Sequence, residues 1–408
     1  MTKILYISYD GMTDQLGQSQ VIPYLVGLSK KEFEIHILSA EKKNNFQKRQ
    51  TYIAELLNSN KINWHSIYYT KKPPIISTLK DISNLKRKAK KLHNIHNFDI
   101  IHCRSYIASF VGLYFKKKFG IKFIFDMRGF FADERIDGNI WNIKNPIFYF
   151  VYKFIKIKEI QFFQNADYTI SLTYEGEKII RTLENCENIY IKVIPCCADL
   201  AHFNYEIIDN NIINNLRKKL NISDNNFIIS YLGSIGTWYL LDEMLQFFKL
   251  LSKKIENSKF LFITNDNPKE IINSATKIGI SENEIIIHSA QREDVPNLLS
   301  LSKLSIFFIK PVFSKKASSP TKLAELLGMG IPVICNAGVG DLDNIFSTNN
   351  IGILIKYFSE NVYNEAIEKL EILQTINKKN IRNVAKTNFS IEIGIEKYYE
   401  VYQTIMEK

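Results

Sequence analysis

Lys322 and Glu325, three positions apart in the segment 318–341, are residue types that could hold a nucleotide-linked sugar. The segment predicts a loop, a short helix with Pro320 at its first position, a glycine turn and a buried strand. The spacing places both ionisable side chains on one helix face. Free N–H groups at a helix start, together with a lysine, favour phosphate. We therefore expect Glu325 to accept ribose hydroxyls; the expected diphosphate contacts are Ser319, Pro320, Thr321 and Lys322. A surface lysine and a solvated carboxylate are the alternatives.

A second charged group follows the predicted strand 122–126. It places five charged side chains within ten residues, next to one glycine and two phenylalanines: Asp126, Arg128, Asp133, Glu134 and Arg135. Such a density of charge is not typical of a core, so we expect Asp126, Arg128 and Glu134 to act in catalysis by orienting the substrates, with Lys322 stabilising the leaving group. A structural salt-bridge cluster is the alternative. Arg104, after the preceding strand, is a further candidate.

The sequence contains no convincing metal-binding pattern. The seven histidines are scattered and the five cysteines lack zinc spacing. Asp341 and Asp343 have the spacing of an acidic pair, but other oxygen ligands for Mg²⁺ or Mn²⁺ are missing. We expect a metal-independent protein without a cofactor, and reduced cysteines indicate the cytoplasm.

Apolar strands and helices alternate along almost all of the 408 residues, which exceed one ordinary core. This pattern predicts parallel sheets covered on both faces. This alternation of strands and helices stops after Pro195, at an irregular stretch that ends near Asn226. The predicted fold class is α/β, with two doubly wound Rossmann-like domains at 1–196 and 205–389 facing across a cleft. A C-terminal helix at 390–408 is expected to pack back onto the first domain, and ligands are expected at the carboxyl ends of the strands.

The elements that must position these residues can be placed on the sequence. Predicted strands are 3–9, 33–39, 62–68, 99–103, 122–126, 168–172, 190–195, 227–232, 259–264, 284–288, 304–309, 331–335 and 351–354. Predicted helices include 20–30, 46–58, 79–93, 175–183, 240–254, 295–301 and 322–329.

The net charge of +11 is concentrated in residues 71–122, which hold thirteen Lys or Arg and two acids. One interpretation is a solvated helix face. The other is attraction to an anionic surface, either lipid or nucleic acid. The chain lacks the aromatic stacking motifs of RNA-binding modules, so we expect no nucleic-acid partner. The buried stripe expected on the helix of this segment is Leu79, Ile82, Leu85, Ala89 and Leu92.

The aromatic and basic stretch 146–158 is apolar nearly all round a helix, so its first interpretation is core packing. Its lysines, Lys153, Lys156 and Lys158, give the alternative that one edge rests on lipid headgroups. No uncharged run approaches the roughly 20 residues that span a bilayer. The expected location is the cytoplasm, at the inner face of the membrane, with peripheral contact to anionic lipid.

Two further motifs precede the 318–332 segment in the chain. Residues 194–199 with Phe203 read IPCCAD…F, and residues 231–234 with Leu241 and Asp242 read YLGS…LD. With these motifs in this order the chain resembles the family 4 (group 1) retaining glycosyltransferases. Their patterns are I-P-N-G-V-D-x-x-x-F, Y-x-G-R…K-G-L-D and S-x-P-T-K-x-x-E-x-L-A-x-G-x-P-V-I. The resemblance covers nearly the whole chain and implies the GT-B fold.

The resemblance also implies further donor contacts and a mechanism. A glycine turn containing Gly17 would admit the donor phosphate, and Arg292 would lie near the base. Retaining enzymes of this fold use front-face attack, in which the donor phosphate takes the acceptor proton, so no protein nucleophile is expected. The other implied donor contacts are Gly233, Ser234 and Lys310.

Three departures from the family pattern bear on the chemistry. Ala317 stands where the family commonly has a glutamate, and Ser234 and Tyr239 replace two phosphate-side cations. Lys322 is the expected substitute for these cations. Arg128 lies in the run where the family often has a histidine, and an arginine cannot act as a base at neutral pH.

The expected activity is transfer of a hexosyl or N-acetylhexosaminyl group from a nucleotide-sugar, taken as UDP-linked from family frequency. The expected acceptor is lipid-linked or a polysaccharide, in the assembly of surface glycans such as lipopolysaccharide. Two alternatives stay open. One is a sugar-nucleotide epimerase of the same fold; the other is a non-catalytic donor-binding partner subunit, which Ala317, Ser234 and Tyr239 suggest.

Overall fold

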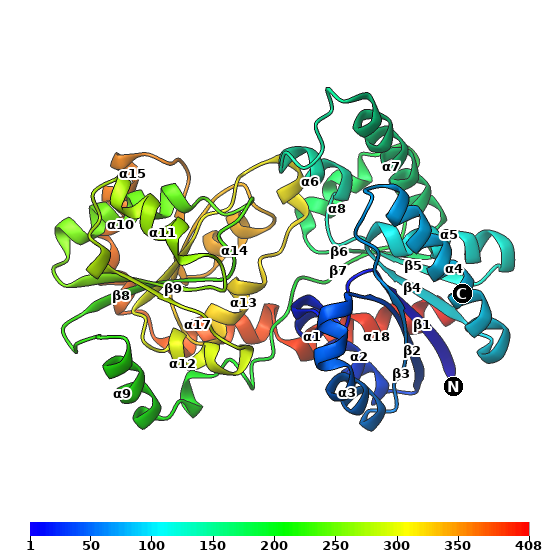
Figure 1. The fold of residues 1–408 in the computed structure, drawn as a ribbon, viewed down its shortest axis with the longest axis horizontal. Coiled ribbons are helices and arrows are strands. Elements are labelled where there is room, and N and C mark those ends of the chain that lie inside the picture. Colours follow the sequence, from blue (N-terminus) through cyan, green and yellow to red (C-terminus); the bar gives the residue numbers. More distant parts are fainter. Residues whose placement is uncertain (408) are drawn as a thin grey trace. The chain divides into compact units, whose positions relative to one another are not determined.

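The computed structural model describes residues 1–407 and divides the chain into two compact units (Figure 1). The N-terminal unit comprises residues 1–196, 316–318 and the chain from Ile391 onward. The C-terminal unit comprises residues 197–315 and 319–390. The short excursion at 316–318 has a packing reason, because Ala317 is fully buried in the hydrophobic core of the N-terminal unit.

Seven parallel strands form the sheet of the N-terminal unit in the order β3-β2-β1-β4-β5-β6-β7. The order reverses between β1 and β4, which is the doubly wound arrangement. All residues of β4 are buried, as a parallel sheet covered on both faces requires. The strands are β1 Thr2–Ser8, β2 Phe33–Glu41, β3 Asn63–Tyr68, β4 Ile100–Arg104, β5 Lys122–Asp126, β6 Tyr168–Ser171 and β7 Ile191–Val193.

Helices lie on both faces of this sheet (Figure 1). The helix expected at 20–30 is interrupted at Val21, because Pro23 has no N–H with which to continue the preceding helix. No helix within residues 1–407 is long and apolar enough to cross a bilayer. The helices are α1 Gln15–Gln20, α2 Ile22–Ser29, α3 Lys43–Ser59, α4 Ile76–His96, α5 Ser105–Phe119, α6 Phe131–Asp137, α7 Pro146–Asn165, α8 Tyr174–Arg181 and α18 Ile391–Glu407.

The C-terminal unit repeats the doubly wound arrangement with six parallel strands in the order β10-β9-β8-β11-β12-β13. The strands are β8 Phe227–Leu232, β9 Ser258–Ile263, β10 Ile285–His288, β11 Leu304–Phe307, β12 Val333–Asn336 and β13 Gly352–Ile355. The helices are α9 Asn210–Lys219, α10 Leu241–Lys254, α11 Pro268–Lys277, α12 Val295–Leu299, α13 Thr321–Gly328, α14 Leu342–Thr348, α15 Glu360–Glu368, α16 Leu370–Gln374 and α17 Lys378–Asn388.

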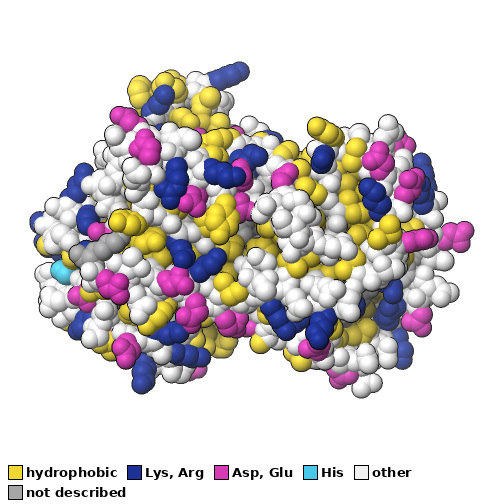
Figure 2. Space-filling view, turned by 180° about the vertical axis from the view of Figure 1, so that it is seen from behind, with side chains coloured by type: hydrophobic (Ala, Val, Ile, Leu, Met, Phe, Trp, Pro, Cys, Tyr) yellow, Lys and Arg dark blue, Asp and Glu magenta, His cyan; other side chains and the backbone are white. Residues whose placement is uncertain are grey.

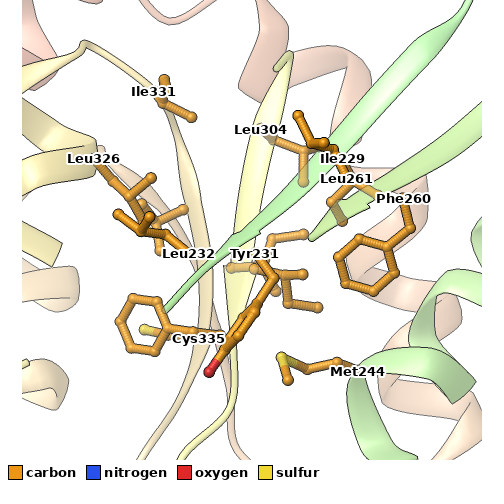
Figure 3. Close-up of a cluster of buried hydrophobic side chains, with 14 of the residues drawn as sticks. Ile229, Tyr231, Leu232, Met244, Phe260, Leu261, Leu304, Leu326, Ile331 and Cys335 are labelled. Carbon is orange, nitrogen blue, oxygen red and sulfur yellow. The ribbon is translucent and has the colours of Figure 1, made fainter. Parts of the chain in front are cut away.

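The predicted α/β class with two doubly wound parallel sheets is confirmed, and each strand predicted from the sequence is present. The core of the C-terminal unit gathers side chains from β8, β9, β12 and α13. Figure 3 shows Tyr231 of β8 among Met244, Leu326 and Cys335, with its phenol oxygen projecting from the apolar cluster. That oxygen contacts Lys322, one of the charged residues described below.

Arg382 of α17 is a buried structural clamp in the C-terminal unit. Its guanidinium donates hydrogen bonds to the backbone carbonyls of Leu200, Phe203 and Gly328. Gly328 ends α13, so the clamp fixes the C-terminal end of the helix that carries Lys322 and Glu325. Sequence reasoning did not identify this residue, because a lone arginine on an amphipathic helix gives no signal.

We predict that Arg382→Met destabilises the protein by about 3 kcal/mol, because it leaves three carbonyls without their donor in a buried place. Urea denaturation followed by circular dichroism measures the change. Lys386→Met, at an exposed position one turn later, is the matched control. Equal loss in both variants would show that the carbonyls do not depend on the clamp.

Candidate active site

Charged side chains meet at the carboxyl ends of β4 and β5. Asp126 ends β5 and is fully buried; its carboxylate lies 3.6 Å from Arg128 Nη1 and 3.6 Å from His102 Nε2. Arg104 ends β4 and its Nε lies 3.3 Å from Asp10 Oδ2. Since neighbouring parallel strands end at one edge of a sheet, these residues converge although the sequence separates them. The structure thus brings together two predicted residues, Asp126 and Arg128, with the further candidate Arg104.

Burial and opposite charge compete at this cluster. Burial alone would raise the pKa of Asp126, but Arg128, His102 and Arg104 outweigh it and lower that pKa to about 2. Burial lowers the pKa of His102, so its ring is neutral at neutral pH. Asp126 is therefore a permanent carboxylate that balances two buried guanidinium groups.

Three residues of this cluster, Tyr398, Tyr402 and His102, were missed from the sequence. The hydroxyl of Tyr398 donates to Asp126 Oδ2 at 2.9 Å, and the Tyr402 hydroxyl lies 2.7 Å from His102 Nδ1. Both tyrosines come from α18, far along the chain. The alternation of His102 and Arg104 on one face of β4 was the available signal for the histidine.

Arg128 adopts a left-handed backbone conformation, with φ 61°, at a non-glycine position. Such a conformation costs on the order of 1 kcal/mol and persists where surrounding contacts determine it. Its side chain is held by Asp126 and by a 3.2 Å hydrogen bond to Cys196 Sγ. The strain therefore aims the guanidinium back over the end of β5.

The remaining residues after β5 separate into different roles. Asp133 accepts hydrogen bonds from Tyr152 at 3.0 Å and Lys156 at 2.8 Å, so it joins α6 to α7 as part of a salt-bridge network. Glu134 lies partly buried in the first turn of α6. Arg135 packs over the Phe131 ring at 4.8 Å. The structural alternative therefore holds for Asp133, while the catalytic role of Glu134 stays a prediction.

The expected glycine turn at Gly17 is wrong in its geometry. Gly17 is buried within α1, and an added Cβ would lie 2.2 Å from the Gly11 carbonyl oxygen. Close packing of α1 on the loop after β1 explains this glycine. The loop itself is held by Glu41 of β2, whose buried carboxylate accepts from Met12 N at 2.7 Å and from Thr13 N at 3.2 Å.

In the C-terminal unit, Lys322 lies buried beside aromatic rings at the carboxyl end of β8. Its side-chain nitrogen is 3.1 Å from the Tyr231 hydroxyl and 3.6 Å from the centre of the Tyr239 ring. A Cβ on Gly233 would approach that nitrogen to 3.3 Å, and the φ of 109° at Gly233 also requires glycine. The surface-lysine alternative is therefore wrong. Cation–π contacts of about 0.5–2 kcal/mol offset part of the dehydration of the ammonium.

Dehydration dominates the electrostatics of α13. Burial lowers the pKa of Lys322 well below its usual value, although the nearby Glu325 opposes this shift. Burial also raises the pKa of Glu325, which Arg292 opposes. An incoming anion would compensate the buried ammonium and restore its ordinary pKa.

Glu325 and Arg292 form an ion pair, with Arg292 Nη1 3.3 Å from Glu325 Oε1. The Arg292 backbone oxygen also receives a contact from His202 Nε2 at 3.0 Å, and its guanidinium lies 5.3 Å from the Phe203 ring centre. Arg292 thus pairs locally with Glu325, and its expected place near the base stays a prediction. Among residues 1–407, the ion pair of Glu325 is made by Oε1, and its side chain is only 12% exposed, so the carboxylate is not a solvated surface group.

Other predicted donor residues lie at the same end of this sheet. Gly233 and Ser234 follow β8, and Ser234 Oγ donates to Asp266 at 2.8 Å. The backbone N–H of Lys310, after β11, donates to the Trp238 carbonyl at 2.9 Å. Strands β8 and β11 flank the point where the strand order reverses, which is where doubly wound sheets bind ligands.

Ser319 and Pro320 precede α13. Pro320 is the N-cap of this helix and Thr321 is its first residue, one position later than expected.

An apolar groove lies beside the charged cluster of the N-terminal unit, with a volume of about 560 Å³. Its walls come from the start of α4, from α5, from α6 and from α7. Two cationic residues line it, Lys71 and Arg135, and Tyr9 of the loop after β1 lies at one side. The apolar lining includes Leu79, Ile82, Phe110, Trp141, Phe150 and Phe154.

This groove corrects two expectations from the sequence. Leu79 is 58% exposed rather than part of the buried stripe of α4. The core interpretation of 146–158 is wrong for one face of α7: buried side chains such as Ile155 and Phe162 face the protein, whereas a second apolar row does not. That exposed row is Ile147, Phe150, Phe154 and Ile157. Periodicity could not separate the two faces because both are apolar.

Two doubly wound sheets, with charged residues at the carboxyl ends of their strands, define the GT-B class of glycosyltransferases. The fold is similar to that of sucrose-phosphate synthase from Thermosynechococcus elongatus (TM-score 0.74, 14% identity, 100% of both chains covered). It is also similar to Anabaena HepE, solved in complex with UDP and glucose (TM-score 0.69, 16% identity, 99% and 100% covered). A third similar structure is WaaG, a glycosyltransferase involved in lipopolysaccharide biosynthesis (TM-score 0.66, 14% identity, 98% and 99% covered).

Family models identify the chain more closely. The model described as "Glycosyltransferase Family 4" matches residues 20–202, and the model described as "Glycosyl transferases group 1" matches residues 212–387. Together they span nearly the whole chain, which therefore belongs to the family 4, group 1 glycosyltransferases. No curated protein sequence matched it.

The depressed pKa of Lys322 generates a stability prediction. The unfolded chain binds a proton at this lysine up to about pH 10.5, whereas the folded chain releases it at lower pH, so the destabilisation that this lysine causes fades as the pH rises toward 10.5. We predict that the free energy of unfolding of Lys322→Met at pH 7 is higher than that of the wild type by up to about 1–2 kcal/mol. This difference should shrink as the pH rises toward 10. Urea unfolding at both pH values measures it, with the exposed Lys303→Met as control. A variant less stable than the wild type at pH 7 would contradict this prediction.

Proposed function

We propose that this glycosyltransferase is a retaining enzyme that transfers a hexosyl or N-acetylhexosaminyl group from a UDP-sugar to a lipid-linked acceptor in surface-glycan assembly. The proposed donor site rests on one observation, the buried and partly dehydrated ammonium of Lys322. It lies where the strand order of the second sheet reverses. A diphosphate supplies the charge that this site lacks, and its negative charge grows as the glycosidic bond breaks. Lys322 and the amides of Ser319 and Thr321 are the proposed stabilisers of the leaving group.

The other predicted residues take roles that fit their surroundings. Glu325 would hold ribose hydroxyls through the oxygen that Arg292 does not engage, and Gly233 leaves space for a phosphate beside Lys322. Ser234 and Lys310 lie at the same strand ends. Asp126 and Arg128 would orient substrates rather than exchange protons, because one is a permanent carboxylate and the other a permanent cation. The donor phosphate would then take the acceptor proton, without a protein nucleophile, metal or cofactor.

The apolar groove supports a lipid-linked acceptor. Its 560 Å³ lies within the roughly 300–1,000 Å³ of small-molecule sites. Lys71 and Arg135 place positive charge in an otherwise apolar lining, as a lipid phosphate or diphosphate requires. The groove begins beside Tyr9, whose neighbour Asp10 contacts Arg104 of the charged cluster. A lipid chain in the groove would therefore bring its phosphorylated end toward these strand ends.

The surface around the groove supports peripheral contact with anionic membrane at the cytoplasmic face. Exposed apolar residues on α7, including Ile147 at 62% and Phe150 at 70%, accompany exposed lysines. In Figure 2, hydrophobic and cationic side chains gather together at the upper left, where the turned view brings α7. Apolar side chains that insert, combined with lysines that meet anionic headgroups, are typical of interfacial helices. The lysines are Lys71, Lys72, Lys80, Lys144 and Lys153.

Two other functions predict different products. A sugar-nucleotide epimerase would convert the donor without an acceptor, so incubation with the UDP-sugar alone and analysis of the sugar distinguishes it. A donor-binding partner subunit would bind without turnover in either assay. A thermal-shift screen of UDP, GDP, ADP and CMP with their common sugars selects the donor for these tests.

The donor site predicts that Glu325→Ala weakens binding of the UDP-sugar by about 1.5–3 kcal/mol, or about 10- to 150-fold in Kd, because a charged hydrogen bond to ribose is lost. Isothermal titration calorimetry measures the affinity. Glu293→Ala, exposed and next to Arg292, is the control. Unchanged affinity in a folded Glu325→Ala protein removes the ribose contact from the proposal.

The acceptor groove predicts that Phe150→Glu reduces both flotation with anionic liposomes and transfer to a polyprenyl-diphosphate sugar by about 10-fold, because an exposed apolar contact of about 1.5 kcal/mol becomes a charge. Transfer to a short water-soluble acceptor should change little. Tyr357→Glu, equally exposed at 74% in the other unit, is the control. If both variants bind liposomes like the wild type, α7 is not the membrane-facing element.

A further inference from the structure

Three histidine rings meet toward the amino-terminal edge of the first sheet, the edge opposite to Asp126 and Arg104. His36 lies on β2, His65 on the neighbouring β3, and His96 is the last residue of α4. One ring nitrogen from each lies within 4.8 Å of the other two. Neighbouring members of the three are about thirty positions apart in the sequence. Histidines that are scattered along the chain therefore come together in the folded protein.

The geometry of the first pair is that of two ligands on one ion. His36 Nδ1 and His65 Nε2 lie 3.2 Å apart. Two nitrogens at roughly 2.0–2.1 Å from a tetrahedral Zn²⁺ are separated by about 3.3 Å. The third ring, His96, packs against His36 with centroids 4.2 Å apart at an interplanar angle of 50°. One nitrogen of His96 lies within 4.8 Å of the other two, so this ring has to approach them to share their ion.

A carboxylate orients the central ring. Glu34, two residues before His36 on the same face of β2, has Oε1 2.9 Å from His36 Nε2. With its Nε2–H donated to Glu34, His36 presents the Nδ1 lone pair toward the other two rings. A carboxylate behind a ligating histidine is the usual outer partner of a metal site, because it fixes the ring and its tautomer. Lys3, 3.6 Å from the other Glu34 oxygen, holds that carboxylate in turn.

The three rings differ in burial, which leaves an approach to the cluster open. His36 is 1% exposed, whereas His65 and His96 are only partly buried. An ion can therefore reach the cluster from the side of β3 and α4.

We propose that His36, His65 and His96 form a binding site for a divalent transition-metal ion of the zinc class, with Glu34 as the outer partner and water in the remaining position. Three nitrogens suit Zn²⁺, Cu²⁺, Ni²⁺ and Co²⁺ and do not suit Mg²⁺ or Ca²⁺. The site lies at the edge of the sheet opposite to the charged strand ends. It joins β2 and β3 to the C-terminal end of α4, whose first turns line the apolar groove.

The test uses the full-length protein, stripped of metal with a chelator and titrated with ZnCl₂ by calorimetry and with CoCl₂ by absorbance. We expect one ion per chain with a micromolar or lower Kd, a tetrahedral Co²⁺ spectrum, and a higher thermal midpoint in Zn²⁺. His65→Gln and His96→Gln should each raise the Kd at least about 10-fold. His93→Gln is the matched control, since His93 lies one turn earlier on α4 and packs against Phe115 and Phe119.

Several outcomes overturn the proposal. The absence of a saturable site in the wild-type protein means that the three rings form a hydrogen-bonded stack without an ion. Equal Kd values in the wild type and in both glutamine variants place the ion elsewhere, as does loss of binding only in His93→Gln. If a variant fails to fold, electron paramagnetic resonance of the wild type with one equivalent of Cu²⁺ decides the matter: nitrogen hyperfine coupling supports the site, and an oxygen-only signal overturns it.

Discussion

Both units of this glycosyltransferase have to bury charge at the carboxyl ends of parallel strands. Helices cover both faces of each sheet, so charged side chains that end a strand or follow it lie close to the apolar core. Removing such charges from water is costly unless partners replace the hydration. The identity of those partners determines what each strand end is able to bind.

The two units meet this constraint in different ways. In the N-terminal unit, Asp126 has a charged partner, Arg128, and accepts a hydrogen bond from the Tyr398 hydroxyl. In the C-terminal unit, Lys322 has a phenol and an aromatic ring as its close partners, while Glu325 pairs with Arg292. A cation held by uncharged partners gains most from an anionic ligand. This difference agrees with the proposed division into an orienting unit and a donor-binding unit.

The fold could be predicted from the sequence because apolar strands and intervening helices leave strong periodic signals, such as the run at Phe227–Leu232. The motif around Lys322 and Glu325 also located α13 to within one residue. What the sequence could not supply is contact across long separations. Tyr398 against Asp126, Arg382 against Leu200, and the three imidazoles depend on topology rather than on local pattern.

The prediction of which side chains are exposed was also wrong in part, and the error has one physical cause. Residues 146–158 contain more apolar side chains than one buried face needs, so composition predicts burial where the structure has a second, outward face. Arg128 differs from this case: its position after β5 was predicted, but its left-handed backbone was not, because nothing in the residue type announces it.

The membership of α18 in the N-terminal unit has a consequence for biosynthesis. During translation the first seven strands emerge long before the residues that carry Tyr398 and Tyr402. Until the ribosome has made those last helical turns, Asp126 and His102 lack two of their hydroxyl partners, and the face that α18 covers is open to water. The unit that leaves the ribosome first is therefore the one that completes its fold last. A chaperone would bind it as a nascent sheet that still lacks α18.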